Sequence, residues 1–87
     1  MRNLYKKILD DFIRERLFLY RINNNLTQSQ IAELLDMDYR SYVDIEHGHN
    51  GCSCMTFVFY LLYIENDPID FLHTISSLFK QANENVA

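Results

Sequence analysis

The first quarter of the chain carries an apolar stripe with helical spacing. Between residues 3 and 22, apolar side chains recur at steps of three and four residues, which places them on one face of an α-helix. The stripe consists of Tyr5, Ile8, Leu9, Phe12, Ile13, Leu17 and Tyr20. Three consecutive asparagines, residues 23–25, then break the pattern. We therefore predict a long first helix that ends near residue 22.

Two short helices follow, and each begins at a good N-cap residue. Thr27 is the first N-cap, and Gln30 stands three residues later, at the spacing of a capping box. The apolar face of this helix has Ile31, Ala32, Leu34 and Leu35. Asp38 is the second N-cap. The helix that it opens is predicted to turn Tyr42 and Ile45 inward and to close at Gly48.

The last part of the chain predicts a loop and two further helices. Residues 47–53 form the loop, after which Ser53 or a neighbour caps a helix that runs to about residue 64. Asp67 followed by Pro68 is a cap with proline at the first helical position, so the last helix begins there. Its expected inward face has Ile69, Leu72, Ile75, Ser76 and Phe79.

These elements predict an all-α fold in which residues 1–87 form a single domain of five helices. The last two helices, at about 53–80, are expected to serve the core and dimerisation, and the tail from Gln81 is expected to fray. With two glycines and one proline, the chain has almost no tight turns for a multi-stranded sheet. A chain of 87 residues also leaves little core for a large internal pocket, which argues against an enzyme.

The cysteines and the charges of the N-terminal segment bear on location. Cys52 and Cys54 are two residues apart, too close for a framework disulfide, so a reduced cytoplasmic protein is expected. The first 20 residues are too charged for a signal-peptide core. The longest uncharged apolar run, residues 54–64, is too short for a bilayer core of about 30 Å. We therefore expect no membrane partner.

The most informative segment is the pair of short helices at 27–46. Their spacing is that of a helix-turn-helix, in which the second helix can enter the DNA major groove. The words Leu-Thr-Gln-x-x-Ile-Ala-x-x-Leu, from Leu26, and Ile-Glu-x-Gly, from Ile45, stand at the separation found in Cro/C1-type, phage-repressor-like regulators. The sequence resembles that family over roughly residues 12–75. The resemblance implies a lambda-repressor-like domain of a bacterium or mobile element that binds double-stranded DNA, regulates transcription and needs no cofactor.

The resemblance also implies roles for individual residues. The positions that touch base edges in relatives are occupied by Tyr39, Arg40, Ser41 and Asp44. The positions that contact DNA phosphates are occupied by Thr27, Gln28, His47, His49 and Asn50. Arg21 and Glu46 match a structural ion pair between the first and third helices. Arg40 is the leading candidate for a base contact, because a guanidinium matches guanine O6 and N7.

The distribution of charge complicates this interpretation. The net charge of −4 divides into +3 over residues 1–25, −4 over residues 26–50 and −3 over residues 51–87. Asp36 stands where relatives usually have glycine in the turn. The helix-turn-helix is itself acidic, so an alternative is a protein interaction module that keeps the scaffold and binds little or no DNA. The basic first helix either lies along phosphates or is a solvated face.

The loop at 47–53 and the residue after it also contain residue types found in zinc sites and in nucleophilic active sites. Four residues within a short stretch are of the types that bind zinc: His47, His49, Cys52 and Cys54. The spacing H-x-H-x-x-C-x-C is crowded for a tetrahedral site, so no metal is expected. A Cys/His nucleophile pair is available, but no oxyanion-hole motif or glycine-rich phosphate loop accompanies it, so we expect no enzyme.

The fourth helix is apolar around its whole circumference, although one core needs only one apolar face. The expected inward residues are Cys54, Phe57, Tyr60, Leu61 and Ile64. The remaining ones are Val58, Phe59, Leu62 and Tyr63, which are expected to form a homodimer surface together with Phe18 of the first helix. Two-fold symmetry suits a palindromic operator with half-sites about 34 Å apart.

Overall fold

The computed structural model describes residues 2–86, with side chains for residues 2–84. This part of the chain contains five helices and no strand, in agreement with the predicted all-α fold. The helices are α1 (Arg2–Asn23), α2 (Gln28–Leu34), α3 (Tyr39–Glu46), α4 (Cys54–Tyr63) and α5 (Pro68–Val86). The α5 helix extends to Val86, so the prediction that the chain frays from Gln81 is wrong.

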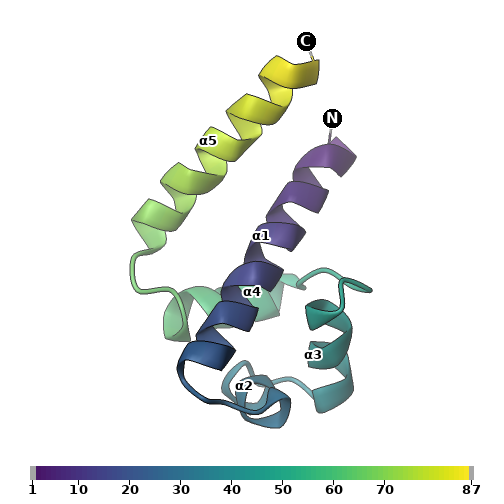
Figure 1. Cartoon of the computed structure of the whole chain (residues 1–87), viewed down its shortest axis with the longest axis vertical. Coiled ribbons are helices and arrows are strands. Elements are labelled where there is room, and N and C mark those ends of the chain that lie inside the picture. Colours follow the sequence, from purple (N-terminus) through teal and green to yellow (C-terminus); the bar gives the residue numbers. More distant parts are fainter. Residues whose placement is uncertain (1, 87) are drawn as a thin grey trace.

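The long helices α1 and α5 pack side by side, while α2 and α3 lie near the C-terminal end of α1 (Figure 1). The α4 helix crosses α1, and the loop after it turns the chain back so that α5 runs toward the N-terminus of α1 (Figure 1). The two chain ends therefore lie at the same end of a molecule that measures 42 × 26 × 21 Å (Figure 1). Contacts between α1 and α3 connect the short helices to this scaffold.

The hydrophobic core draws on all five helices. Its buried members are Ile13, Leu17, Ile31, Ala32, Leu35, Tyr42, Ile45, Tyr60, Ile64, Phe71 and Ile75. Phe71 is the aromatic centre: its ring lies 5.4 Å from that of Phe12, 5.8 Å from Phe57 and 5.6 Å from Tyr60, between ring centroids. Burial of one such side chain stabilises the fold by about 1.5–3 kcal/mol, so this cluster holds α1, α4 and α5 together.

The helix caps follow the predicted positions. Thr27 Oγ1 accepts a hydrogen bond from the Gln30 backbone N–H, and the Gln30 side chain accepts one from the Thr27 N–H, which completes the capping box. Asp38 and Ser53 cap α3 and α4 through their side-chain oxygens. Because these caps satisfy otherwise free N–H groups, they fix where each short helix begins.

Two expected inward faces are only partly correct: Tyr60 in α4 and Ile75 in α5 are buried as predicted, but other members of these faces are not. In α5, Ile69 and Leu72 are 68% and 58% exposed, while Phe71 is 1% exposed and points into the core. The apolar arc of α5 is wide enough for two neighbouring stripes, and the aromatic cluster around Phe71 selects one of them. In α4, Cys54 is exposed, because Thr56 and Tyr60 are the residues that this helix buries.

Candidate nucleic-acid interface

The outward face of α3 presents two side chains freely to solvent. Tyr39 is 53% exposed, and the Arg40 side chain is 85% exposed. Ser41 is half-buried, and its backbone N–H and hydroxyl donate to Asp38 at 3.0 and 2.7 Å. The structure thus separates Tyr39 and Arg40, which can reach a partner, from Ser41, whose polar atoms belong to the helix cap.

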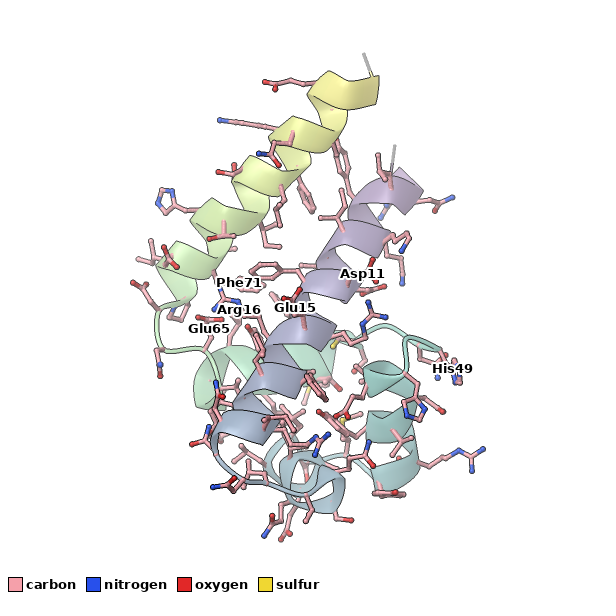
Figure 2. The ribbon with its side chains drawn as sticks, in the orientation of Figure 1. Asp11, Glu15, Arg16, His49, Glu65 and Phe71 are labelled. Atoms are coloured by element: carbon pink, nitrogen blue, oxygen red, sulfur yellow. The ribbon has the colours of Figure 1, made fainter. Side chains whose placement is uncertain are left out.

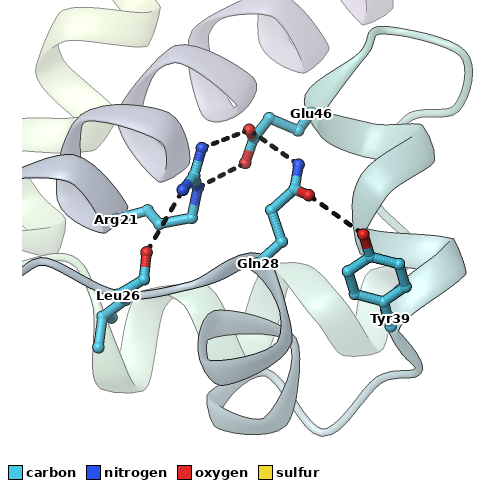
Figure 3. Close-up of polar contacts among 5 residues, drawn as sticks. All are labelled: Arg21, Leu26, Gln28, Tyr39 and Glu46. Carbon is cyan, nitrogen blue, oxygen red and sulfur yellow. Dashed lines mark hydrogen bonds and ion pairs between the residues drawn. The ribbon is translucent and has the colours of Figure 1, made fainter.

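A polar network joins α3 to α1 and α2 behind this face (Figure 3). Arg21 Nε and Nη2 donate to the Glu46 carboxylate at 3.0 and 2.8 Å, so the ion pair expected from the resemblance is present. Arg21 Nη1 also donates to the Leu26 carbonyl at 3.3 Å. The ion pair is bidentate, and its side chains are only 16% exposed for Arg21 and 8% exposed for Glu46. It is therefore a structural link between α1 and α3 rather than a solvent-exposed ion pair.

Gln28 extends the network toward solvent. Its Nε2 donates to Glu46 Oε1 at 3.2 Å, and its Oε1 accepts from the Tyr39 hydroxyl at 3.4 Å (Figure 3). The resemblance implied a phosphate contact for Gln28 and a base contact for Tyr39, and it implied no contact between the two residues. The structure links both side chains to each other across the turn between α2 and α3.

The network also lowers the pKa of the Glu46 carboxyl. Burial by itself raises the pKa of this carboxyl, but hydrogen bonds from Arg21 and Gln28 and the charge of Arg21 outweigh it, so the pKa lies below its ordinary value. Burial raises the pKa of the neighbouring Tyr42, whose hydroxyl lies near Glu46 without a hydrogen bond of ordinary geometry. Glu46 is therefore ionised at neutral pH, and its negative charge is directed inward, toward Arg21.

The loop after α3 rests on the charged side of α1. Gly48 has φ of +80°, and a Cβ atom there would collide with the Arg14 guanidinium. A Cβ atom at Gly51 would collide in the same way with the Asp10 carboxylate. Both glycines therefore permit close approach of the loop to α1. Figure 2 shows His49 at the outer tip of this loop.

A cleft of about 360 Å³ runs between α1 and the loop. Its lining includes Lys6, Lys7 and Arg14 from α1 and His49 and Asn50 from the loop. The sequence alone does not reveal that the α1 cations lie beside the loop, because only the packing of α1 against α3 brings them together. These groups form a flank of the candidate interface.

The cations of α1 are mostly compensated. Lys6 lies 2.7 Å from Asp10, Lys7 lies 2.8 Å from Asp11, and Arg14 Nη2 lies 3.2 Å from the other Asp11 oxygen. All are near the surface, where such pairs contribute about 0–1 kcal/mol each and exchange readily with other anions. Lys6, Lys7 and Arg14 therefore do not form a free basic patch, although the net charge of the first 25 residues is +3.

The predicted dimer surface on α4 lies on the outside of the molecule. Val58, Leu62 and Tyr63 are 43%, 65% and 53% exposed. Phe59 is half-buried and its ring stacks on that of Tyr63, with 5.8 Å between centroids. Phe18 is 42% exposed on α1. The apolar face of α4 that was not assigned to the core from the sequence is therefore largely exposed in the single chain.

The histidines and cysteines remain separate. Within residues 2–86, no group of three or more His, Cys, Asp and Glu side chains has an arrangement that could hold a metal ion. Cys52 and Cys54 are both free thiols. Burial raises the pKa of Cys52 to about 11, so this thiol stays protonated at neutral pH. Among the described helices, none is long and apolar enough to cross a membrane.

We compared the chain with protein-family models, curated proteins and solved structures, and none of them matches it.

Proposed function

We propose that this chain is a sequence-specific DNA-binding regulator of transcription that acts as a homodimer and inserts α3 into the major groove of a palindromic operator. The observation that carries the proposal is the Arg21–Glu46–Gln28–Tyr39 network, which holds two capped short helices as one unit while Arg40 points to solvent. A recognition helix needs this combination, because base contacts require a rigid support and an exposed reader.

Phosphate contacts would surround α3. The Thr27 hydroxyl accepts a bond from Gln30 but keeps its own proton to donate, and it lies at the start of α2. On the other side of α3, His47, His49 and Asn50 are all exposed. Phosphate contacts of this kind fix the orientation of a protein on the duplex and carry no direct sequence information.

The acidic charge of the helix-turn-helix is less of an obstacle than the sequence suggests. Of its acidic residues, Glu46 is directed inward to Arg21, and Asp38 is engaged by the first turn of α3. Glu33 and Asp36 remain exposed. We expect nonspecific DNA affinity to be weak, because few free cations face the duplex, and specific binding to depend on dimerisation.

Selection of binding sites from a random duplex library, followed by anisotropy titrations at several salt concentrations, tests the proposal. A single sequence family with two-fold symmetry is expected. The proposal fails if no sequence is enriched and affinity for every duplex stays weaker than about 10⁻⁶ M at low salt.

Arg40→Ala supplies the test at residue level. It should relax preference at one base pair per half-site by about tenfold, because a bidentate arginine contributes about 1–3 kcal/mol of discrimination. Lys80→Ala is the matched control, since it removes the same charge from an exposed position on α5. Equal loss of preference in both variants would contradict the assignment of Arg40 as a base reader.

The alternative is a protein interaction module on the same scaffold. The paired α1 cations and the exposed α4 face favour it. A stoichiometric protein partner from a native extract, together with failure to select any DNA, would support this function over DNA binding.

A further inference from the structure

Asp44 occupies a junction between the recognition helix and the loop that follows it. Its Oδ1 lies 3.9 Å from Arg40 Nε and 3.8 Å from His49 Nδ1. Its backbone carbonyl accepts hydrogen bonds from the N–H groups of His49, at 2.8 Å, and Asn50, at 3.3 Å. The Asp44 side chain thus lies near the side chains of Arg40 and His49, and its backbone carbonyl holds the backbone of the loop tip.

The geometry does not suit the base-contacting role that the sequence suggested for Asp44. Its side chain is 28% exposed, whereas that of Arg40, one turn earlier on the same face, is 85% exposed. A carboxylate that accepts from cytosine N4 must stand free at the surface of α3. Here the carboxylate faces its neighbours in the protein.

The approach of Asp44 to Arg40 leaves part of the guanidinium available for a base contact. Asp44 faces the Nε side of the guanidinium, so the two terminal nitrogens remain available for guanine O6 and N7. An arginine side chain that is free in solution loses rotamer entropy when it is fixed in a complex. A carboxylate four residues later on the helix restricts these rotamers before DNA is bound, which lowers that cost.

We propose that Asp44 is a positioning residue, whose side chain orients Arg40, and that it contacts no base. This inference rests on the proposed DNA-binding function and adds the residue that sets its specificity. It explains why an acidic side chain can stand on a DNA-binding surface: its charge faces Arg40 and His49.

The experiment compares Asp44→Asn, Arg40→Ala and the double variant on the selected operator, on operators changed at single base pairs, and on an unrelated duplex. Asp44→Asn keeps the side-chain shape but removes the charge. It should lower preference at the base pair read by Arg40 about fivefold, while affinity for the unrelated duplex rises about twofold because one anion has gone. In the Arg40→Ala background, Asp44→Asn should leave preference unchanged.

Asp44→Glu is the conservative variant and should restore part of the preference, since it keeps a carboxylate within reach of Arg40. A loss of preference at a different base pair that persists without Arg40 would overturn the inference, because Asp44 would then read its own base. A uniform rise in affinity with unchanged preference would overturn it as well, since Asp44 would act only as a repelling charge.

A second measurement needs no DNA. The ¹⁵N order parameter of Arg40 Nε should fall in Asp44→Asn, while that of Arg16 Nε stays constant as an internal control, because Arg16 lies over the Phe12 ring instead. An unchanged Arg40 order parameter contradicts the inference even when the wild type selects DNA. If the wild-type protein selects no duplex, the proposed DNA-binding function is contradicted. Asp44 then has no role in reading DNA, whatever the order parameter of Arg40 is.

Discussion

Asp36 shows what a single residue contributes to the turn between α2 and α3. Its φ of 55° lies in the left-handed region, which aspartate adopts more easily than most residues other than glycine and asparagine. Cro/C1-type regulators, which the sequence resembles, usually have glycine at this position. The backbone conformation explains why the chain tolerates aspartate there.

The first prediction compares two substitutions at this position. Asp36→Gly should raise the free energy of unfolding or leave it unchanged, because relief of the left-handed conformation offsets the greater freedom of the unfolded chain. Asp36→Ala should lower it by about 1 kcal/mol. Urea unfolding of both variants measures the difference. An alanine variant more stable than the glycine variant would contradict the assigned conformation.

Glu46 provides a second prediction at residue scale, on pH dependence. Its folded-state pKa lies below the ordinary value of 4.5, so its pair with Arg21 stabilises the fold at neutral pH. This contribution is lost as pH falls through the lowered folded-state pKa. The free energy of unfolding of the wild type should therefore decline below about pH 5 more steeply than that of Glu46→Gln.

At neutral pH, the free energy of unfolding of Glu46→Gln should be about 2 kcal/mol lower, since the substitution weakens charge-assisted hydrogen bonds from the half-buried Arg21. The control is Glu33→Gln, which removes an exposed carboxylate from α2 and should leave the pH profile unchanged. Chemical denaturation across the acid range provides both profiles. Parallel profiles for Glu46→Gln and the wild type would show that the pair is not the source of the pH dependence.

At the scale of elements, the short helices depend on their surroundings. The α2 and α3 helices have seven and eight residues, too few to be stable alone, so their caps, their packing against each other and the packing of α3 against α1 hold them. The α5 helix is long enough to form on its own, but its apolar arc is broad, so its sequence does not define which side faces the core. Its rotation about its own axis is decided by what it packs against.

Neighbouring alanine substitutions test that rotation. Phe71→Ala should destabilise the fold by about 3–5 kcal/mol, because it empties the centre of the aromatic cluster. Leu72→Ala removes a neighbouring side chain that is 58% exposed and should change stability by less than about 0.5 kcal/mol. Thermal unfolding followed by circular dichroism distinguishes the two. Comparable losses would mean that α5 is rotated relative to the structure.

At the scale of the whole molecule, the exposed face of α4 is the main feature that one chain leaves unexplained. Val58, Leu62 and Tyr63 are exposed on one short helix that also supplies Tyr60 to the core. Exposed apolar patches of a few hundred Å² commonly mark interaction surfaces. The proposed homodimer would cover this face and place two copies of α3 on successive major grooves.

Leu62→Glu tests the homodimer. Sedimentation equilibrium should find the wild type dimeric at micromolar concentration and the variant monomeric, since a carboxylate at the centre of the interface cannot be desolvated without cost. Leu62 is 65% exposed, so the monomer should remain folded. Ile69→Glu is the matched control, on an exposed apolar position of α5. Dissociation by Ile69→Glu alone would move the interface to α5.

The sequence was a sufficient basis for predicting the local features of this protein. The caps at Thr27, Asp38 and Ser53 and the strained turn at Asp36 depend on residues within a few positions of one another, so local chemistry decides them. The inward faces of α2 and α3 were also predictable, because each helix has a single narrow apolar stripe. The Arg21–Glu46 pair was accessible only through resemblance to a family, since the two residues are far apart in the chain.

Tertiary packing decided what remained. A helix with a wide apolar arc can present more than one face to a core, so the burial of Phe71 and the exposure of Cys54 depended on neighbours that periodicity does not identify. The same holds at the candidate interface, where side-chain direction joins Gln28 to Tyr39 and Asp44 to Arg40. Spacing along the chain establishes which residues share a helix face, but only the packed structure establishes which of them face each other and which remain exposed to solvent.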